Sequence, residues 1–420
     1  EKTCGRFPPY GSLVAPLGVA FLEEGVDALA GVVGVEQVDE ALALLGQPGV
    51  RPTFAGALDQ RLDGAHRHRA LPRHLGCQQQ GGAARFAAVH HLLDQADAQG
   101  GVAYPIDRTA RVYIAGHRGL VGSALWRHLR SQGFTDLVGR TSSELDLRDR
   151  EATFEFFAIE QPDVVILAAA KVGGIGANST RPVDFLSDNL RIQVNVLDAA
   201  LAHRVDRLLF LGSSCIYPKF APQPITEDAL LTGPLESTND AYAIAKIAGI
   251  LHVQAVRRQY GLPWISAMPT NLYGPGDNFS PTGSHVLPAL IARYERARGQ
   301  GERSVVNWGT GSALREFLHV DDMADACLFL LEHFDGPTQV NVGTGKDLSI
   351  RELAEMVAST VGFTGETRWD ETKPDGTPRK VLDISTLTKL GWRSRVGLAE
   401  GLAATVEWYR TAGAGVRGQG

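Results

Sequence analysis

The stretch Arg111-Val-Tyr-Ile-Ala-Gly-His-Arg-Gly-Leu-Val-Gly122 decides the fold. Residues 111–115 suit a buried strand, and Gly116, Gly119 and Gly122 follow it at intervals of three. Glycines allow a tight turn, a close approach of the backbone to a pyrophosphate and close packing of a helix on the strand. The N-terminus of that helix would face the phosphates. This spacing therefore predicts a dinucleotide site at the first strand.

Apolar, strand-like runs alternate with helical stretches along the chain after this turn. The alternation predicts βαβ units and a Rossmann-type, doubly wound parallel sheet covered on both faces. Shorter elements with glycine and proline punctuation follow and predict a smaller C-terminal α/β lobe. We expect a dinucleotide-binding domain over 110–278 with a return segment near 316–345, a mainly substrate-binding lobe over 279–410, and a flexible tail over 411–420.

The leader, residues 1–109, differs in composition from the rest of the chain. It holds none of the six tryptophans or three methionines and only one lysine, Lys2. It can be an extra domain, a disordered extension or sequence foreign to the protein. The absence of an initiating methionine and the choice of residues favour upstream translation before the true start, so we expect no function from it.

The overall composition argues against several functional classes. A formal net charge of −6 lacks the basic footprint of nucleic-acid binding. No run of 18 apolar residues predicts a membrane span, and no secretory signal begins the chain. The four cysteines show no CxxC spacing, which favours a reducing compartment without structural zinc. We expect a cytoplasmic protein with no metal, no nucleic-acid partner and no membrane association.

The end of the second strand bears on the choice of cofactor. NAD sites usually place an acidic residue there to hold the ribose hydroxyls, but this strand ends at Arg140. Arg140 and Arg118 can pair with a 2′-phosphate, which favours NADP, whereas the nearby Glu144 would suit NAD. Asp146 and Leu147 either contact the adenine or begin the next helix.

Polar residues after the fourth strand and on the following helix predict carbonyl chemistry. Ser213, Ser214 and Cys215 follow the strand, and the carboxyl ends of parallel strands face the ligand crevice. Tyr242 and Lys246 are four residues apart and therefore share one face of a helix.

Reduction of a ketone needs a proton donor at the carbonyl oxygen. A tyrosine has a pKa of about 10, and an adjacent ammonium lowers it. We expect Tyr242 to donate the proton and Lys246 to lower the pKa of Tyr242 and hold the nicotinamide ribose. Ser213 or Ser214 would hydrogen-bond the substrate oxygen.

These stretches together resemble the extended short-chain dehydrogenase/reductases, and among them the GDP-L-fucose synthases. The resemblance covers about residues 111–410 and not the leader. It implies that GDP-4-keto-6-deoxy-mannose is epimerised at C3 and C5 and then reduced at C4 by NADPH, in a homodimer. The matching stretches are 115–123, 168–174, 211–219, 242–249, 269–275, 284–286, 315–322 and 373–380.

The resemblance also implies roles for single residues. Epimerisation needs a base on one face and an acid on the other, and Cys215 and His285 match that pair. Which of the two acts as base at each carbon stays open. Without the resemblance, Cys215 would be interpreted as a small buried apolar residue and His285 as structural.

The expected cofactor contacts join the glycine turn, the ends of three strands and the catalytic residues. The family's arginine for the 2′-phosphate aligns with Ser142, which leaves that task to Arg140 and Arg118. The full set is Gly116, His117, Arg118, Gly119, Leu120, Val121, Gly122, Arg140, Ser142, Asp146, Leu147, Leu211, Gly212, Ser213, Ser214, Lys246, Pro269, Thr270, Asn271, Leu272 and His285.

The substrate contacts implied by the resemblance are Arg293, Trp308, Arg315 and Asp375. Arginines can clamp a diphosphate, and an indole offers an apolar face to a sugar or base. Taken alone, Trp308 would be interpreted as core filler and Arg293 as a solvated helix charge.

Two alternatives remain. Another NAD(P)-dependent nucleotide-sugar epimerase or 4-ketoreductase would share the tyrosine and cofactor but would not need Cys215 and His285. A protein of another class, a non-catalytic NADP sensor, would not need Ser213, Tyr242 and Lys246.

Overall fold

Six parallel strands form the central sheet of the computed structural model, which describes residues 104–280, 283–373 and 375–411. The predictions for residues 1–103 and 412–420 lie outside the described residues. The doubly wound α/β class predicted from the sequence is confirmed. The strands, in spatial order, are β2 (Leu137–Val138), β1 (Val112–Ala115), β3 (Val164–Leu167), β4 (Arg207–Leu211), β5 (Ile265–Pro269) and β9 (Val340–Val342).

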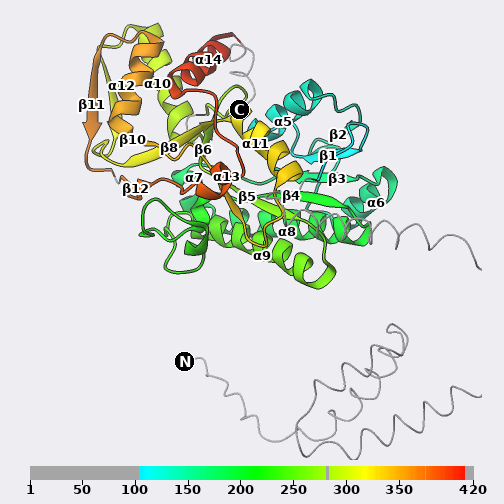
Figure 1. The fold of residues 1–420 in the computed structure, drawn as a ribbon. Coiled ribbons are helices and arrows are strands. Elements are labelled where there is room, and N and C mark those ends of the chain that lie inside the picture. Colours follow the sequence, from blue (N-terminus) through cyan, green and yellow to red (C-terminus); the bar gives the residue numbers. More distant parts are fainter. Residues whose placement is uncertain (1–103, 281–282, 374, 412–420) are drawn as a thin grey trace, which may run out of the picture. The chain divides into compact units, whose positions relative to one another are not determined.

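Helices cover both faces of this sheet (Figure 1). Every residue of β1, β3 and β4 is buried, because the strands contact a helical layer on either side. One layer contains α5 (Leu120–Ser131) and α11 (Val320–His333), and the other contains α6 (Arg150–Glu160), α8 (Pro182–Ala202) and α9 (Asp240–Tyr260). No helix in the described part of the chain is both long and apolar enough to span a bilayer.

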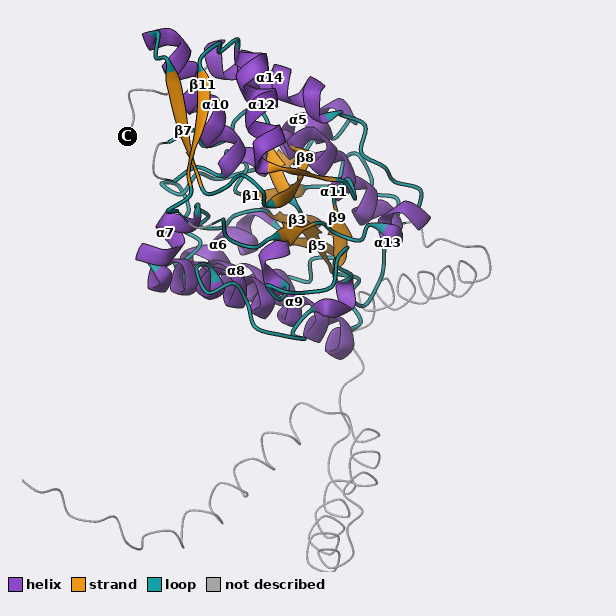
Figure 2. Ribbon diagram, turned by 90° about the vertical axis from the view of Figure 1, so that its left-hand side faces the viewer, coloured by secondary structure: helices purple, strands orange, loops and turns teal. Residues whose placement is uncertain are grey.

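A second lobe has its own buried core around Tyr294 and Phe317. Its helices lie on one side of short strands (Figure 2). The helices are α10 (Val286–Gln300), α12 (Ile350–Val361) and α14 (Leu398–Thr411). The strands are β6 (Asn271–Tyr273), β7 (Ser304–Trp308), β8 (Leu314–His319), β10 (Asp347–Ser349), β11 (Glu366–Asp370) and β12 (Arg379–Lys380).

Short elements connect these layers. The turn of 3₁₀-helix η1 (Ser214–Ile216) follows β4, and η2 (Glu227–Ala229) lies in the loop before α9. Helices α7 (Ile175–Thr180) and α13 (Ser385–Lys389) complete the described elements.

One buried carboxylate connects the two lobes. Glu316, on β8, is 0% exposed. It accepts hydrogen bonds from the backbone N–H groups of Thr344 (2.5 Å), Gly345 (2.7 Å) and Leu382 (2.9 Å). Burial raises the pKa of Glu316, and these hydrogen bonds act in the opposite direction. The loop after β9 and the segment after β12 are therefore fastened to the same strand.

The glycine turn depends on close backbone packing. Gly116 has a φ of +84°, and a Cβ on Gly122 would lie 2.1 Å from the carbonyl oxygen of Gly116. That distance is far below van der Waals contact, and the obstructing atom is backbone. A side chain at either position would push α5 away from β1.

We expect Gly122→Ala to lower the free energy of unfolding by about 2 kcal/mol or more, because overpacking at this contact forces the backbone to move. The matched control is Gly299→Ala in α10, where an added Cβ meets nothing within 4 Å. That change should raise stability by about 0.5–1 kcal/mol through helix propensity. Urea denaturation measures both, and equal stabilities of the two variants would contradict the packing argument.

Candidate active site

The glycine turn presents backbone rather than side chains to a ligand. Gly119 caps the N-terminus of α5 and contributes no side-chain hydrogen bond to the first turn of the helix. A Cβ there would meet only the Gly116 carbonyl oxygen, at 3.4 Å, so the approach is open. Helix N–H groups and the helix dipole at this point suit a phosphate group. The residues therefore fit the diphosphate of a dinucleotide.

His117 fills the space beside the turn. A Cβ on Gly139 would lie 2.5 Å from the imidazole of His117, and this ring also lies 5.6 Å from the ring of Trp126. Burial lowers the pKa of His117, with Arg118 adding to the effect. The imidazole is thus packed between α5 and the end of β2.

Two arginines lie at the corner expected to receive a 2′-phosphate. Arg140 donates a hydrogen bond to the carboxylate of Glu160, and its guanidinium lies 5.5 Å from the Phe156 ring centre. Arg118 is exposed, and no ion pair among the described residues includes it. Ser142, two residues after Arg140, is also exposed. Arg118 is therefore the cation that can reach an added phosphate without breaking an existing ion pair.

Asp146 and Leu147 lie just beyond this corner. Asp146 pairs with Arg148 at 2.8 Å, and this contact lowers its pKa. Leu147 packs against the buried cluster under α6 and α8. The N-cap of α6 is Asp149, whose carboxylate accepts from Ala152 N–H. Asp146 is thus outside the helix it was considered to begin.

Lys246 is buried beneath the end of β4. Its ammonium donates to the carbonyl oxygen of Leu211 at 2.7 Å and lies 4.9 Å from the Phe210 ring centre. The Tyr242 ring centre is 6.0 Å away. Burial lowers the pKa of Lys246 to about 7, because few groups replace the lost solvation of the ammonium.

The pKa of Tyr242 is raised in this structure, not lowered. Burial raises the pKa of Tyr242, the neighbouring Cys215 raises it further, and a hydrogen bond with Ser213 only partly opposes them. The Lys246 ammonium donates its hydrogen bond to Leu211 O and not to the phenol. Tyr242 is therefore held in the protonated form, which is the form a proton donor needs.

The segments after β4 and β5 lie side by side, since these strands are neighbours in the sheet. Gly212 N–H donates to Ala267 O, and a Cβ on Gly212 would lie 2.3 Å from the Met268 methyl carbon. Pro269 ends β5, and the next three predicted cofactor contacts follow it where the main sheet meets the second lobe. Thr270 N–H donates to Val342 O, Asn271 donates to Glu316 O at 2.8 Å, and Leu272 packs on the core of the main sheet.

Cys215 lies in η1, and Ser213 is the N-cap of that turn. The thiol is half-buried and accepts hydrogen bonds from Asn239 Nδ2 at 3.4 Å and Lys380 Nζ at 3.6 Å. Its surroundings are polar, so the interpretation of Cys215 as an apolar core residue is wrong. His285 is exposed at the N-cap of α10. Desolvation of the imidazole and, after it, the charge of Lys380 lower the pKa of His285.

Sequence reasoning missed Asn239 and Lys380. Asn239 is the N-cap residue of α9, and Lys380 ends the matching stretch 373–380. Neither position carried a sequence signal for contact with Cys215. The contacts depend on tertiary structure, since Lys380 is 165 residues from Cys215.

The expected substrate residues lie on the second lobe. Arg293 donates to Asn307 Oδ1 at 2.6 Å, so it is not a freely solvated charge. Trp308 is 66% exposed, which rules out core filler, and the Lys373 ammonium lies 5.9 Å from its ring centre. Burial lowers the pKa of Arg315, although Cys215 and acidic neighbours oppose the shift. Asp375 accepts from Thr310 N–H and Oγ1, both at 2.8 Å, and so fastens its own loop.

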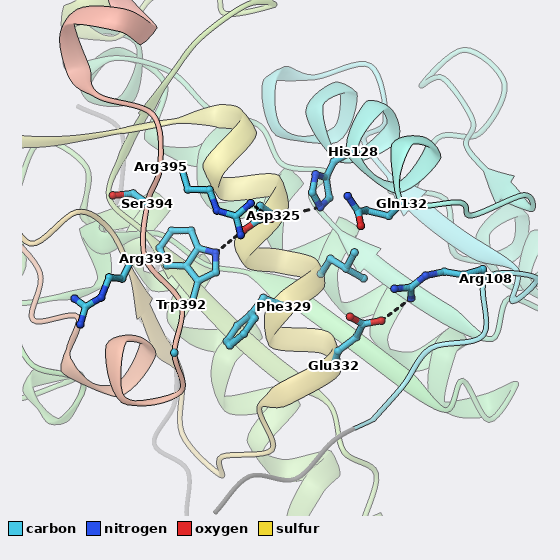
Figure 3. A pocket seen from close by; sticks show the side chains of 12 residues that line it. Arg108, His128, Gln132, Asp325, Phe329, Glu332, Trp392, Arg393, Ser394 and Arg395 are labelled. Atoms are coloured by element: carbon cyan, nitrogen blue, oxygen red, sulfur yellow. Dashed lines mark hydrogen bonds and ion pairs between the residues drawn. The ribbon is translucent and has the colours of Figure 1, made fainter.

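A separate cavity of about 340 Å³ lies away from these residues (Figure 3). It lies between α5, α11 and the segment after α13, and it contains Arg108, His128, Asp325 and Trp392. Its charged groups pair with one another, as in Arg108–Glu332 and the hydrogen bond from Trp392 Nε1 to Asp325. None of the expected catalytic residues lines it.

A model of the NAD dependent epimerase/dehydratase family matches residues 112–343. The chain belongs to this family. The resemblance predicted from the sequence is confirmed, since relatives within the family carry the expected name. GDP-L-fucose synthase 1 of Arabidopsis thaliana is 60% identical over 303 residues, which is 72% of this chain and 94% of that protein.

Two further family members extend the comparison. GDP-L-fucose synthase of Escherichia coli (strain K12) is 53% identical over 308 residues, covering 71% of this chain and 96% of that protein. The crystal structure of a GDP-L-fucose synthetase from Naegleria fowleri bound to NADP is 26% identical with a TM-score of 0.68. The match covers 74% of this chain and 97% of that one. The family's description accordingly indicates a nicotinamide cofactor for this chain.

The lowered pKa of Lys246 should make the stability of the folded protein depend on pH. Its pKa falls from 10.5 in the unfolded chain to about 7 in the folded protein, so the unfolded state binds more protons between these values. Stability should then rise with pH across this range, by up to about 1 kcal/mol per pH unit. Lys246→Met removes this contribution, whereas Lys389→Met, at an exposed lysine, keeps it.

The measurement is urea unfolding of the nucleotide-free protein at pH 7, 8 and 9. The difference in unfolding free energy between wild type and Lys246→Met should grow in favour of wild type as the pH rises. The lost hydrogen bond to Leu211 shifts the variant equally at every pH. Parallel stability curves would therefore show that Lys246 has an ordinary pKa.

Proposed function

We propose that this protein converts GDP-4-keto-6-deoxy-mannose to GDP-L-fucose by epimerisation at C3 and C5 followed by NADPH-dependent reduction at C4. The observation that carries the proposal is the meeting of Ser213, Tyr242 and Cys215 at one strand end, where Ser213 hydrogen-bonds the Tyr242 phenol and Cys215 lies in the turn that Ser213 caps. Carbonyl reduction alone would need only the first two. The high identity to the Arabidopsis and Escherichia coli proteins supports the same activity.

The reduction step uses a proton donor that is already protonated. NADPH supplies the hydride when it is bound at the glycine turn. Tyr242 gives its proton to the C4 oxygen as charge develops there, and Ser213 hydrogen-bonds Tyr242 and the substrate oxygen. Lys246, held by Leu211 O, supplies a donor for the nicotinamide ribose and for proton recovery by Tyr242.

The epimerisation step uses the C4 ketone in a different way. A ketone makes the hydrogens on its neighbouring carbons acidic, because the enolate is delocalised. Cys215 and His285 provide the base and acid that remove a proton from one face and return one to the other. Both groups act at C3 and then at C5, before the ketone is reduced.

Arg293, Trp308 and Arg315 hold the nucleotide end of the substrate in this proposal. Burial lowers the pKa of both arginines, which means that their charges are only partly compensated by the protein. A diphosphate would supply the missing anionic partner. The exposed face of Trp308 offers a stacking surface to the base or sugar.

NADP rather than NAD is the cofactor in this proposal. Arg118 is exposed beside the glycine turn and has no ion-pair partner among the described residues, whereas Arg140 is paired with Glu160. The NADP-bound structure from Naegleria fowleri supports this choice.

The proposal also includes a cytoplasmic homodimer formed through α8 and α9. These helices expose Val194, Ile244 and Leu251 to 38–46% on the surface away from the sheet. Burial of such side chains between two subunits would stabilise the dimer.

The deciding experiment incubates purified protein with GDP-4-keto-6-deoxy-mannose and either NADPH or NADH. We expect NADPH to be consumed faster and the product to be GDP-L-fucose, identified by NMR of the sugar. A reduced sugar that keeps the manno configuration at C3 and C5 would support a simple 4-ketoreductase. No cofactor consumption would support the sensor alternative.

We expect Tyr242→Phe to lower the rate of C4 reduction by about 10²–10⁴-fold, the usual contribution of a positioned proton donor. Binding of NADPH, followed by calorimetric titration, should stay within twofold because the ring is retained. Tyr260→Phe, at the exposed end of the same helix, is the matched control. A Tyr242→Phe variant with full reductase activity would remove the tyrosine from the mechanism.

A further inference from the structure

Arg293 is held on the second lobe by uncharged partners. Its Nη1 donates to the carboxamide oxygen of Asn307 at 2.6 Å and to the carbonyl oxygen of Val306 at 3.3 Å. Both acceptors lie on β7, beside α10, which carries Arg293 (Figure 2). The described residues give Arg293 no carboxylate partner, whereas Glu295 on the same helix pairs with Arg410 at 2.6 Å.

Asn307 belongs to a chain of hydrogen bonds inside the second lobe. Its side chain is 2% exposed, and its Nδ2 donates to the hydroxyl oxygen of Tyr294 at 3.0 Å. The Tyr294 hydroxyl, which is also buried, lies 2.9 Å from Thr367 Oγ1 on β11. The carboxamide is therefore bonded on both of its polar atoms, once to the interior and once to Arg293.

The direction of each hydrogen bond in this chain follows from the chemistry of the groups. A guanidinium has donors only, so the carboxamide has to present Oδ1 to Arg293 and Nδ2 to Tyr294. The Tyr294 oxygen accepts from Nδ2, and its own proton is directed at Thr367. Because each group has one role, the Asn307 oxygen is held where Arg293 meets it.

These contacts leave most of the guanidinium available to a ligand. Both hydrogen bonds to β7 come from Nη1, and Nε and Nη2 of Arg293 have no hydrogen-bond partner among the described residues. The remaining N–H groups can bind a phosphate, for which the planar fork of arginine is well suited. A neutral acceptor fixes the guanidinium without cancelling its charge, which a carboxylate would do.

We propose that Asn307 is a positioning residue, which orders Arg293 for the diphosphate of the substrate and leaves the positive charge uncompensated. The inference rests on the function proposed above. Ordering lowers the cost of binding, because a guanidinium that is already held does not have to be immobilised when the ligand arrives. The neutrality of Asn307 matters as well, since a carboxylate at position 307 would compete with the diphosphate for the same cation.

The first test titrates GDP into the protein by calorimetry, with NADP⁺ at saturation so that GDP cannot occupy the cofactor site. Asn307→Val removes the acceptor and suits a strand. It should weaken GDP binding by about threefold to tenfold, because Arg293 then has to be ordered on binding. Arg293→Met should weaken it by about tenfold or more, because the charge-assisted hydrogen bonds themselves are lost.

The second test separates charge from position through Asn307→Asp. The carboxylate keeps an acceptor of the same size opposite Arg293, so a residue that only supported the fold would tolerate the change. We expect GDP to bind about tenfold more weakly, because the new carboxylate forms the charge-assisted pair that the diphosphate would otherwise make. The salt dependence of GDP binding should also become shallower, since one cation fewer is available to the ligand.

A readout on the phosphate alone distinguishes positioning from a structural role. Guanosine lacks the diphosphate and should bind the wild type and both Asn307 variants within twofold. With GDP-4-keto-6-deoxy-mannose as substrate, both variants should raise KM and leave kcat within twofold, because the lost contact is made equally in the ground state and the transition state.

Thr367→Val is the matched control. It removes the hydroxyl at the far end of the chain, two hydrogen bonds away from Asn307, and leaves the contact with Arg293 intact. GDP affinity should stay within twofold of wild type. If Asn307→Val does not fold, as judged by circular dichroism, Asn307→Leu takes its place and is subject to the same expectations.

GDP affinity within twofold of wild type in either folded Asn307 variant would overturn the proposal, as would an equal loss of guanosine binding. Failure of the proposed function gives a different result. A wild type that does not bind GDP, or that binds it unchanged after Arg293→Met, would overturn the placement of the nucleotide at Arg293. Binding of GDP without turnover of the ketosugar would overturn the proposed reaction and leave the role of Asn307 supported.

Discussion

The hydrogen bonds to the buried Glu316 carboxylate are the interaction on which the rest of the site depends. They tie β8, the loop after β9 and the segment after β12 into one unit. A carboxylate without solvent is costly, and several charge-assisted hydrogen bonds are what make its burial tolerable. Their positions also determine where neighbouring residues lie. Arg315 precedes Glu316, and Lys380 lies two residues before Leu382. The hydrogen bonds of the Glu316 carboxylate therefore hold the backbone that carries both cations.

Desolvation dominates the electrostatics of the proposed catalytic residues Tyr242 and Lys246. It pushes Tyr242 and Lys246 toward their neutral forms, so the two groups do not form the phenolate–ammonium pair that their spacing alone suggests. Cys215 lies closer to solvent and has a cation within hydrogen-bonding distance. The site therefore contains a neutral acid for reduction next to a thiol in a cationic environment. Two different proton-transfer reactions can share one ketone because their groups experience different surroundings.

The sequence was sufficient for features that repeat or that local geometry determines. The strand and helix alternation predicted the sheet, and the four-residue spacing placed Tyr242 and Lys246 on one helix face. It was insufficient where a side chain chooses among partners distant in the chain. In the structure, Arg140 donates a hydrogen bond to Glu160, Asp375 accepts one from Thr310, and Lys380 donates one to Cys215. Burial, which reversed the expected shift of Tyr242, is likewise a property of the assembled layers and not of the local spacing.

The chain passes repeatedly between the two lobes. β5 continues into β6, β8 into α11, and β9 into β10, so the second lobe is assembled from several separate segments. Such a lobe cannot be excised or exchanged between relatives as one contiguous gene fragment. A new sugar specificity in this fold must then arise by substitutions within the separate segments. Each substituted segment must still fit the hydrogen bonds to Glu316 that join the two lobes. Because the chain passes between the two lobes several times, the lobes are inherited as a single unit.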